Sequence, residues 1–231
     1  MRKTLVLDLD NTLVASFSTS KQQLLEVCDL VVTVAREKFH DTLKIAVFKR
    51  PYLDEFLEVA CSLFDVWIFT ASDKSYAQPV CEQLLNSKSR FKGCLFRESL
   101  SKGIKDLSIF NVSMDQIMII DDDEYNFQLQ PNNGVAISSF GFDTMSIARE
   151  QKLDCELKNL IDLLKTVAHS DTVYGPISKY KQLHTSSYLN CDLSPITTVG
   201  TPAIKSFSPF DGIDENSPPP SSSSSASSVL I

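Results

Sequence analysis

The chain has 231 residues, of which 43% are hydrophobic, and a formal net charge of −7 at pH 7. This composition is typical of a soluble globular protein, and the length allows one large domain or a medium domain with a tail. The acidic balance excludes a protein that binds nucleic acid through a basic face.

The first predicted strand, KTLVLDLD, ends in two carboxylates, Asp8 and Asp10. Residues i and i+2 of an extended chain point to the same side, so both carboxylates are predicted to share one site. Two close carboxylates shift each other's pKa unless a cation intervenes, and Mg²⁺ prefers such oxygen ligands. Taken alone, the D-x-D-x-T pattern also fits a strand followed by an ordinary acidic turn.

Residues 29–50 contain two β-rich stretches separated by a polar turn, which predicts a hairpin. A helix is predicted to begin near Pro51, because YLDEFLEVACSLF places its apolar residues on one face. The next core strand, DVWIFTAS, ends in the small polar residues Thr70 and Ser72, and residues 73–85 form another predicted helix.

The segment GCLF predicts a short strand, and DQIMIIDDD predicts a core strand that ends at Asp121 and Asp122. One more strand, GVAISSF, and a long closing helix at residues 146–169 complete the pattern. Strands alternating with helices predict an α/β fold with a Rossmann-like parallel sheet and right-handed crossovers. In such a sheet the three polar strand ends lie along one edge, where α/β proteins place their chemistry.

Residues 170–231 lose this periodicity and include the run NSPPPSSSSSASS. Such a segment cannot bury enough apolar surface to offset the entropy of ordering it. We therefore predict a domain at residues 1–169 and a disordered Ser/Pro-rich tail at residues 170–231.

The six cysteines are scattered without a C-x-x-C pair, and the three histidines do not cluster with them. This pattern predicts free thiols in a reducing compartment and argues against a zinc site. The N-terminal segment runs directly into the first strand, so we expect no signal peptide. No apolar stretch approaches the roughly 20 residues that a membrane span requires.

The residues at the three strand ends match the needs of phosphate-ester cleavage, which are a nucleophile, a proton donor and countercharge. Asp8 is the candidate nucleophile, which would form an aspartyl-phosphate. Asp10 can protonate the leaving oxygen and later activate water, and its backbone carbonyl is a candidate metal ligand. The pair Asp121 and Asp122 offers a further oxygen ligand for Mg²⁺.

Thr70 can offer its hydroxyl group to a phosphate oxygen, and SLSKGIKDLS offers Lys102 and Lys105 as the lysine that would hold the nucleophile. Each feature also has an ordinary explanation, such as an acidic loop, a helix cap or a surface lysine. Their joint occurrence at the strand ends favours a catalytic site.

These segments resemble the haloacid dehalogenase superfamily of phosphatases and, more narrowly, its FCP/SCP-like (NLI-interacting-factor-like) members, which act on the C-terminal domain of RNA polymerase II. The resemblance covers residues 3–168, and the matching stretches are LVLDLDNTLV, KRPYLDEFLEVACSLFDVWIFTASDKSYAQPV, LFRESLSKGIKDLS and IMIIDDDEYNFQLQPNNGVAI.

The resemblance implies a haloacid dehalogenase fold with a small β-hairpin insertion and a Mg²⁺-dependent protein serine/threonine phosphatase. It implies a phosphoprotein substrate such as the RNA polymerase II C-terminal domain, with no direct nucleic-acid or membrane partner. A nuclear location follows from the resemblance alone, and the sequence otherwise allows a nuclear or cytoplasmic protein. Two alternatives are a small-molecule phosphatase of the same superfamily and a non-catalytic scaffold that keeps the fold.

The resemblance also assigns roles by position. Asp8 aligns with the nucleophile and metal ligand, and Asp10 with the general acid/base. The other aligned positions are the phosphate-loop residues Thr12 and Thr70, the phosphate-binding Lys105, the acidic motif Asp121 and Asp122, and Arg97, which aligns with an arginine near the bound phosphoserine.

The chain departs from the family pattern at three places. Asn11 replaces a usual glutamate, and Asp122 stands where asparagine is common. The stretch from Arg97 to Lys105 is shorter than in the human-type small phosphatases. In the family this stretch borders the substrate groove, so the departure bears on substrate identity more than on the chemistry.

The insertion around residues 29–50 corresponds to a part of the family's peptide-binding wall. An apolar side chain there, such as Val31 or Phe48, is expected to receive a proline.

Overall fold

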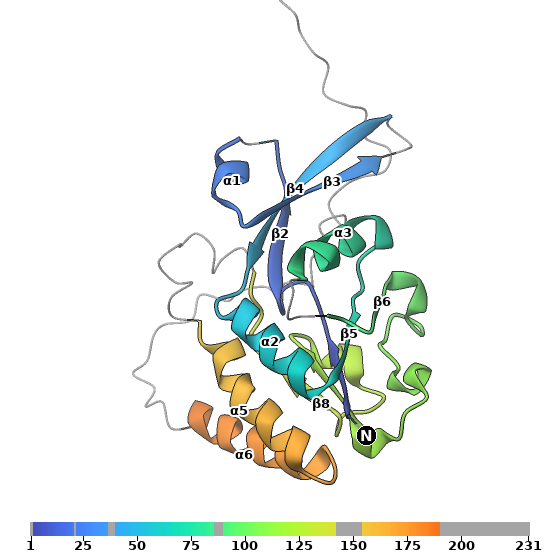
Figure 1. The fold of residues 1–231 in the computed structure, drawn as a ribbon, viewed down its shortest axis with the longest axis vertical. Helices are drawn as coiled ribbons and strands as arrows, with labels where there is room; N and C mark the ends of the chain where they lie inside the picture. Colours follow the sequence, from blue (N-terminus) through green and yellow to red (C-terminus); the bar gives the residue numbers. More distant parts are fainter. Residues whose placement is uncertain (1, 21, 37–39, 86–89, 142–153, 190–231) are drawn as a thin grey trace, which may run out of the picture.

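The computed structural model describes residues 2–20, 22–36, 40–85, 90–141 and 154–189. A five-stranded parallel sheet runs through the middle of the molecule (Figure 1), which confirms the predicted α/β class. In spatial order its strands are β6 (Gly93–Leu95), β5 (Asp65–Phe69), β1 (Thr4–Leu7), β7 (Ile117–Asp121) and β8 (Gly134–Ala136).

The central strands are buried on both faces, and their alternate residues face two separate cores. On β1, Leu5 and Leu7 belong to the larger core, whereas Val6 faces the smaller one. On β7, Met118 and Ile120 face the larger core in the same way. This burial explains why both strands appear in the sequence as continuous apolar runs rather than as alternating patterns.

An antiparallel sheet stands beyond the carboxyl ends of the parallel strands (Figure 1). The predicted hairpin is confirmed as β3 (Leu30–Arg36) paired with β4 (Asp41–Lys49). The structure adds β2 (Val14–Ser18), which sequence analysis missed, and it pairs with the other side of β4. Its sequence, VASFS, is too short and too polar to predict a strand without the partner that it pairs with.

Helices α2 (Leu53–Leu63), α5 (Glu156–His169) and α6 (Tyr174–Leu189) lie side by side on one face of the parallel sheet (Figure 1). Helix α3 (Lys74–Leu84) instead packs against β3 of the antiparallel sheet. The remaining helical elements are α1 (Gln22–Val27), η2 (Arg97–Ser99), η3 (Leu107–Phe110), η4 (Met114–Gln116) and η5 (Glu124–Phe127). None of the helices in the described parts of the chain combines the length and apolarity that a membrane crossing requires.

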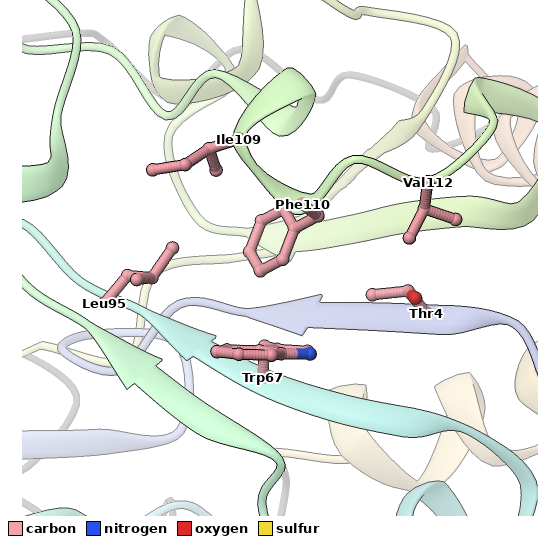
Figure 2. Close-up of a pocket in the computed structure, with 6 residues that line it drawn as sticks. All are labelled: Thr4, Trp67, Leu95, Ile109, Phe110 and Val112. Atoms are coloured by element: carbon pink, nitrogen blue, oxygen red, sulfur yellow. The ribbon is translucent and has the colours of Figure 1, made fainter.

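The other face of the sheet carries the smaller core and an apolar cavity of about 160 Å³. Figure 2 shows the Trp67 ring lying along the sheet with Phe110 of η3 above it, and their ring centroids are 5.4 Å apart. The cavity is lined by Thr4, Trp67, Leu95, Ile109, Phe110 and Val112. These residues do not include any of the predicted site residues.

The boundary between domain and tail at residue 170 stays a prediction, and the structure shows packed residues on the far side of it. Residues just beyond α5 are bonded to the segments that precede β1 and β7, because Lys3 Nζ donates to the Ser170 carbonyl (2.5 Å) and the Val173 amide donates to the Asp115 carbonyl (2.9 Å). Helix α6 follows and buries Ile177. Its Gly-Pro start and weak amphipathicity gave no helical signal.

Two sequence predictions lie partly outside the described residues. The closing helix expected at residues 146–169 is present as α5 from Glu156, and residues 142–153 are not described. The tail prediction for residues 190–231 also falls outside the described range.

Truncating Ile177, which is 2% exposed, should therefore destabilise the domain. Ile177→Ala is expected to lower the free energy of unfolding by about 2–5 kcal/mol, the usual cost of such a cavity. The matched control is Leu183→Ala on the same helix, where the side chain is 62% exposed and the expected change is about 0.5 kcal/mol or less. Urea denaturation of the full chain measures both, and equal effects would contradict the packing of α6.

Candidate active site

The carboxyl ends of three neighbouring parallel strands bring the predicted site residues together. Asp8 directly follows β1, Thr70 directly follows β5, and Asp121 is the last residue of β7. The strands are in register, because Leu7 of β1 is paired with Ile68 of β5 and Ile120 of β7. The Asp8 amide also donates to the Ile120 carbonyl (3.0 Å), so the first residue beyond β1 is still held by the sheet.

Lys105 is completely buried and joins two of these carboxylates. Its Nζ lies 2.5 Å from Asp8 Oδ1 and 2.6 Å from Asp121 Oδ2. Of the two lysines that the sequence offered, Lys105 therefore lies in the site, whereas Lys102 is exposed on the preceding turn. Because a buried ammonium needs charged partners, this contact fixes both carboxylates and the segment that carries Lys105.

Asp121 is held on its second oxygen as well. Its Oδ1 accepts hydrogen bonds from the Asp123 amide (3.0 Å) and from Asn126 Nδ2 (2.9 Å). The Asn126 carbonyl in turn accepts from the Lys105 amide (2.8 Å). The segment is anchored by Phe127, whose ring occupies the space that a side chain at Gly134 of β8 would need. Asp121 is thus a fixed support with both oxygens engaged.

Asp122 is more accessible and is oriented by Thr12. The Thr12 hydroxyl donates to Asp122 Oδ1 (3.1 Å) and accepts from the Asp122 amide (3.0 Å). Thr12 is fully buried, so its hydroxyl group serves Asp122 in this structure. The predicted role of Thr12 in phosphate binding stays a prediction.

Asp8, Asp121 and Asp122 form a group that suits a hard divalent cation. One oxygen from each carboxylate lies within 4.8 Å of the others. Lys105 is the ammonium that contacts this group, so three carboxylates leave two negative charges uncompensated. A cation with oxygen ligands, such as Mg²⁺, fits both the donor atoms and the charge.

The pKa shifts have the same origin. Burial raises the pKa of Asp8 well above its usual range, the Lys105 ammonium opposes the rise, and Asp121 and Asp122 add to it. Burial also raises the pKa of Asp122. For Lys105, burial alone would lower the pKa, but Asp121 and Asp8 reverse that effect and raise it. Asp8 and Asp122 therefore favour protonation unless further positive charge is supplied.

The Asp10 side chain is not part of this group of three carboxylates and is held by two hydroxyl groups. Ser72 Oγ donates to Asp10 Oδ2 (2.7 Å), and the Tyr76 hydroxyl donates to Asp10 Oδ1 (2.6 Å). Burial raises the pKa of Asp10, and the hydrogen bonds from Tyr76 and Ser72 oppose the rise. The predicted metal contact through the Asp10 backbone carbonyl stays a prediction.

Thr70 directly follows β5, whereas Arg97 begins η2, which comes after β6. Thr70 is buried and its Oγ1 accepts from the Ser72 amide (3.0 Å). Arg97 Nε donates to the Ala71 carbonyl (2.7 Å) and lies 3.5 Å from Asp73 Oδ1, with 43% of the side chain exposed. Arg97 is thus the more accessible of the two, and both proposed phosphate contacts stay predictions.

Sequence analysis missed two residues that support the site. Tyr76 lies in the helix predicted at residues 73–85, where no sequence pattern distinguished it, and it is fully buried. Arg50 is 1% exposed, and it donates to Asp154 Oδ2 (2.9 Å) and to the Thr12 carbonyl (3.2 Å). The phrase KRPYLDEFL contained this arginine, but no spacing pattern indicated that it would be buried under the loop after β1.

The sequence profile of the NLI interacting factor-like phosphatases matches residues 3–174. Phosphatase Herzog of Drosophila melanogaster is 34% identical over 186 residues, which cover 78% of this chain and 48% of the fly protein. Human carboxy-terminal domain RNA polymerase II polypeptide A small phosphatase 1 is 34% identical over 175 residues, which cover 74% of this chain and 61% of the human protein. The chain thus spans about half the length of the fly protein and about three fifths of the human protein.

Among solved structures, the fission yeast RNA polymerase II CTD phosphatase Fcp1-R271A bound to beryllium fluoride aligns with a TM-score of 0.53 at 17% sequence identity. The alignment covers 81% of this chain and 56% of the yeast chain. At this identity the likeness establishes the fold, which is the haloacid dehalogenase fold that the sequence predicted.

A divalent cation should stabilise the folded protein. Adding Mg²⁺ after chelation is expected to raise the melting temperature, since saturation at 100 times Kd is worth about 2.7 kcal/mol. Asp122→Ala should lose most of this increment, whereas Glu124→Gln, which changes an exposed carboxylate nearby, should keep it. Differential scanning calorimetry with EDTA or Mg²⁺ measures the increment, and equal wild-type melting temperatures would contradict the site.

Proposed function

The chain belongs to the NLI interacting factor-like phosphatase family, and we propose that it is a Mg²⁺-dependent protein serine/threonine phosphatase that forms an aspartyl-phosphate on Asp8. The observation that carries the proposal is the buried Lys105 ammonium between Asp8 and Asp121. Asp122 lies close enough to these two carboxylates to share a metal ion with them. This arrangement supplies a fixed nucleophile and countercharge at one edge of the sheet.

Asp8 is suited to be the nucleophile because one of its oxygens is held by Lys105 while the residue stays 5% exposed at the carboxyl end of β1. Burial raises the pKa of Asp8, but the Lys105 ammonium and a divalent cation bound at the site would both favour the ionised carboxylate, which is the reactive form. Because Lys105 is itself fixed by Asp121, the nucleophile is positioned before a substrate arrives.

Asp10 is suited to be the general acid/base. Its raised pKa favours the protonated form, which a general acid requires. In the first step an Asp8 oxygen bonds to phosphorus while the bond to the serine oxygen breaks, and Asp10 gives that oxygen its proton. In the second step the Asp10 carboxylate takes a proton from the water that attacks phosphorus, and inorganic phosphate and free Asp8 result.

Asp8 and Asp122 are the side chains that we assign to Mg²⁺, with the Asp10 backbone carbonyl as a further ligand. Asp121 is a weaker candidate, since both of its oxygens are already engaged with Lys105, Asn126 and the Asp123 amide. The ion supplies countercharge for the phosphoryl oxygens when it is bound. Aspartate in place of asparagine at position 122 adds one negative charge that favours cation binding.

The proposed substrate is phosphoserine beside proline in an extended peptide, as in the RNA polymerase II C-terminal domain. The insertion consists of a small antiparallel sheet, which suits a polypeptide better than a large closing lid would. Val31 on β3 is 41% exposed and available for an apolar contact, whereas Phe48 is 5% exposed and packs against Phe17. Of the two candidates for the proline contact, Val31 is therefore the better supported.

Replacing the nucleophile tests the mechanism directly. Asp8→Asn should abolish hydrolysis, and Asp10→Asn should slow it by about 10²–10⁴-fold through loss of proton transfer. Asp162→Asn is the matched control, because this aspartate side chain on α5 is 88% exposed. Release of inorganic phosphate from a phosphoserine peptide in Mg²⁺ measures all three. Substantial turnover by Asp8→Asn would sink the assignment of the nucleophile.

Replacing Arg97 tests whether the substrate is a phosphopeptide or a small molecule. Arg97→Ala should raise KM for a phosphoserine-proline peptide by about tenfold, the value of one lost charge-assisted hydrogen bond, and raise it less for a small aryl phosphate. The control is Lys165→Ala on α5. A panel of kcat/KM values for phosphopeptides and sugar phosphates completes the test. A clear preference for sugar phosphates would favour the small-molecule alternative instead.

A further inference from the structure

Tyr76 is a fully buried tyrosine whose hydroxyl group lies between two sheets. It hydrogen-bonds Asp10 Oδ1 (2.6 Å) at the edge of the parallel sheet and the Ser16 hydroxyl on β2 of the antiparallel sheet. Its own helix, α3, packs against β3. A buried phenol requires hydrogen-bond partners, and here the partners are the proposed general acid and the insertion.

We propose that Tyr76 is a positioning residue that orients Asp10 for proton transfer and links that orientation to the insertion through Ser16. The inference rests on the proposed function, since it concerns the role of Asp10 in phosphate-ester cleavage. Ser72 completes the arrangement by donating to the other Asp10 oxygen.

The direction of these hydrogen bonds follows from counting protons. The ionised Asp10 carboxylate can only accept, so Tyr76 uses its single proton on Oδ1 and the Ser72 hydroxyl uses its proton on Oδ2. The Ser16 hydroxyl then donates to the Tyr76 oxygen, which keeps the phenol proton directed at Asp10. The chain Ser16–Tyr76–Asp10 therefore has one consistent polarity.

This polarity decides where a proton on Asp10 can sit. Tyr76 and Ser72 each occupy one lone pair of a different carboxylate oxygen, so a catalytic proton on Asp10 takes one of the remaining lone pairs. Rotation of the carboxyl group would break two hydrogen bonds at once. Without Tyr76 the proton has several orientations, and only a fraction of them can reach the leaving oxygen.

The test is Tyr76→Phe, which removes the hydroxyl group and keeps the ring. A serine alkoxide needs a proton as it leaves, whereas 2,4-dinitrophenolate leaves without one. Tyr76→Phe should therefore lower kcat/KM for a phosphoserine peptide by about tenfold or more and change kcat/KM for 2,4-dinitrophenyl phosphate by less than about twofold. The ratio kcat/KM is chosen because it reports the step in which the leaving group departs. Tyr174→Phe, at the partly exposed start of α6, is the matched control and should change neither value.

A double-mutant cycle separates positioning from a general loss of structure. In the Asp10→Asn background Tyr76→Phe should cost nothing further on the peptide, because the group that it orients no longer carries a proton. Ser16→Ala, at a partly exposed position, should show the same dependence on the leaving group with a smaller loss, and it provides the test if Tyr76→Phe lowers the melting temperature.

Equal losses on the two esters, or losses that multiply in the double variant, would overturn the inference. The proposed function fails in a different way. If the wild type hydrolyses neither ester, the phosphatase assignment falls before any variant is compared. If the wild type is active and Asp10→Asn shows the leaving-group dependence while Tyr76→Phe and Ser16→Ala do not, only the inference about Tyr76 is overturned.

Discussion

The ion pairs of Lys105 with Asp8 and Asp121 are the contacts on which the rest of the site depends. All three side chains are buried, and removing one member of such a group leaves an uncompensated buried charge, at a cost of about 3–5 kcal/mol. The same contacts join the end of β1, the end of β7 and the segment that leads into η3. The parallel sheet brings the two strand ends together, and Lys105 fixes their separation.

This arrangement is electrostatically incomplete on its own. One ammonium faces three carboxylates, and burial weakens the solvation that would otherwise screen them. Apolar side chains packed at this edge of the sheet would make the fold more stable than buried carboxylates do. The cluster of carboxylates is therefore better explained by cation binding than by a contribution to stability. Asp121 and Asp122 differ in their surroundings. Asp121 is held by Asn126 and Lys105, whereas Asp122 keeps partial access to solvent.

The residues at strand ends could be predicted because buried strands have a strong sequence signature and parallel sheets place their carboxyl ends together. Asp8 and Asp121 belong to this class. Tyr76 and Arg50 could not be predicted in the same way, since their hydrogen-bond partners are distant in sequence. In the sequence alone, Tyr76 fits the apolar face of a helix and Arg50 fits an exposed basic position. The strand β2 and the helix α6 were missed because each depends on tertiary partners, with Ile177 supplying the packing that intrinsic propensity does not.

The segment before Lys105 reverses direction through a tight turn of its own. Ser101 and Ile104 exchange two backbone hydrogen bonds of 2.9 and 3.0 Å across Lys102 and Gly103, which both have positive φ. This is the two-residue turn that reverses a chain most sharply, and glycine at its second position lowers the strain. The turn lets a short segment deliver Lys105 to the buried site while Lys102 stays in solvent. Because the reversal is completed within the segment itself, the contact of Lys105 with Asp8 and Asp121 does not require a longer loop.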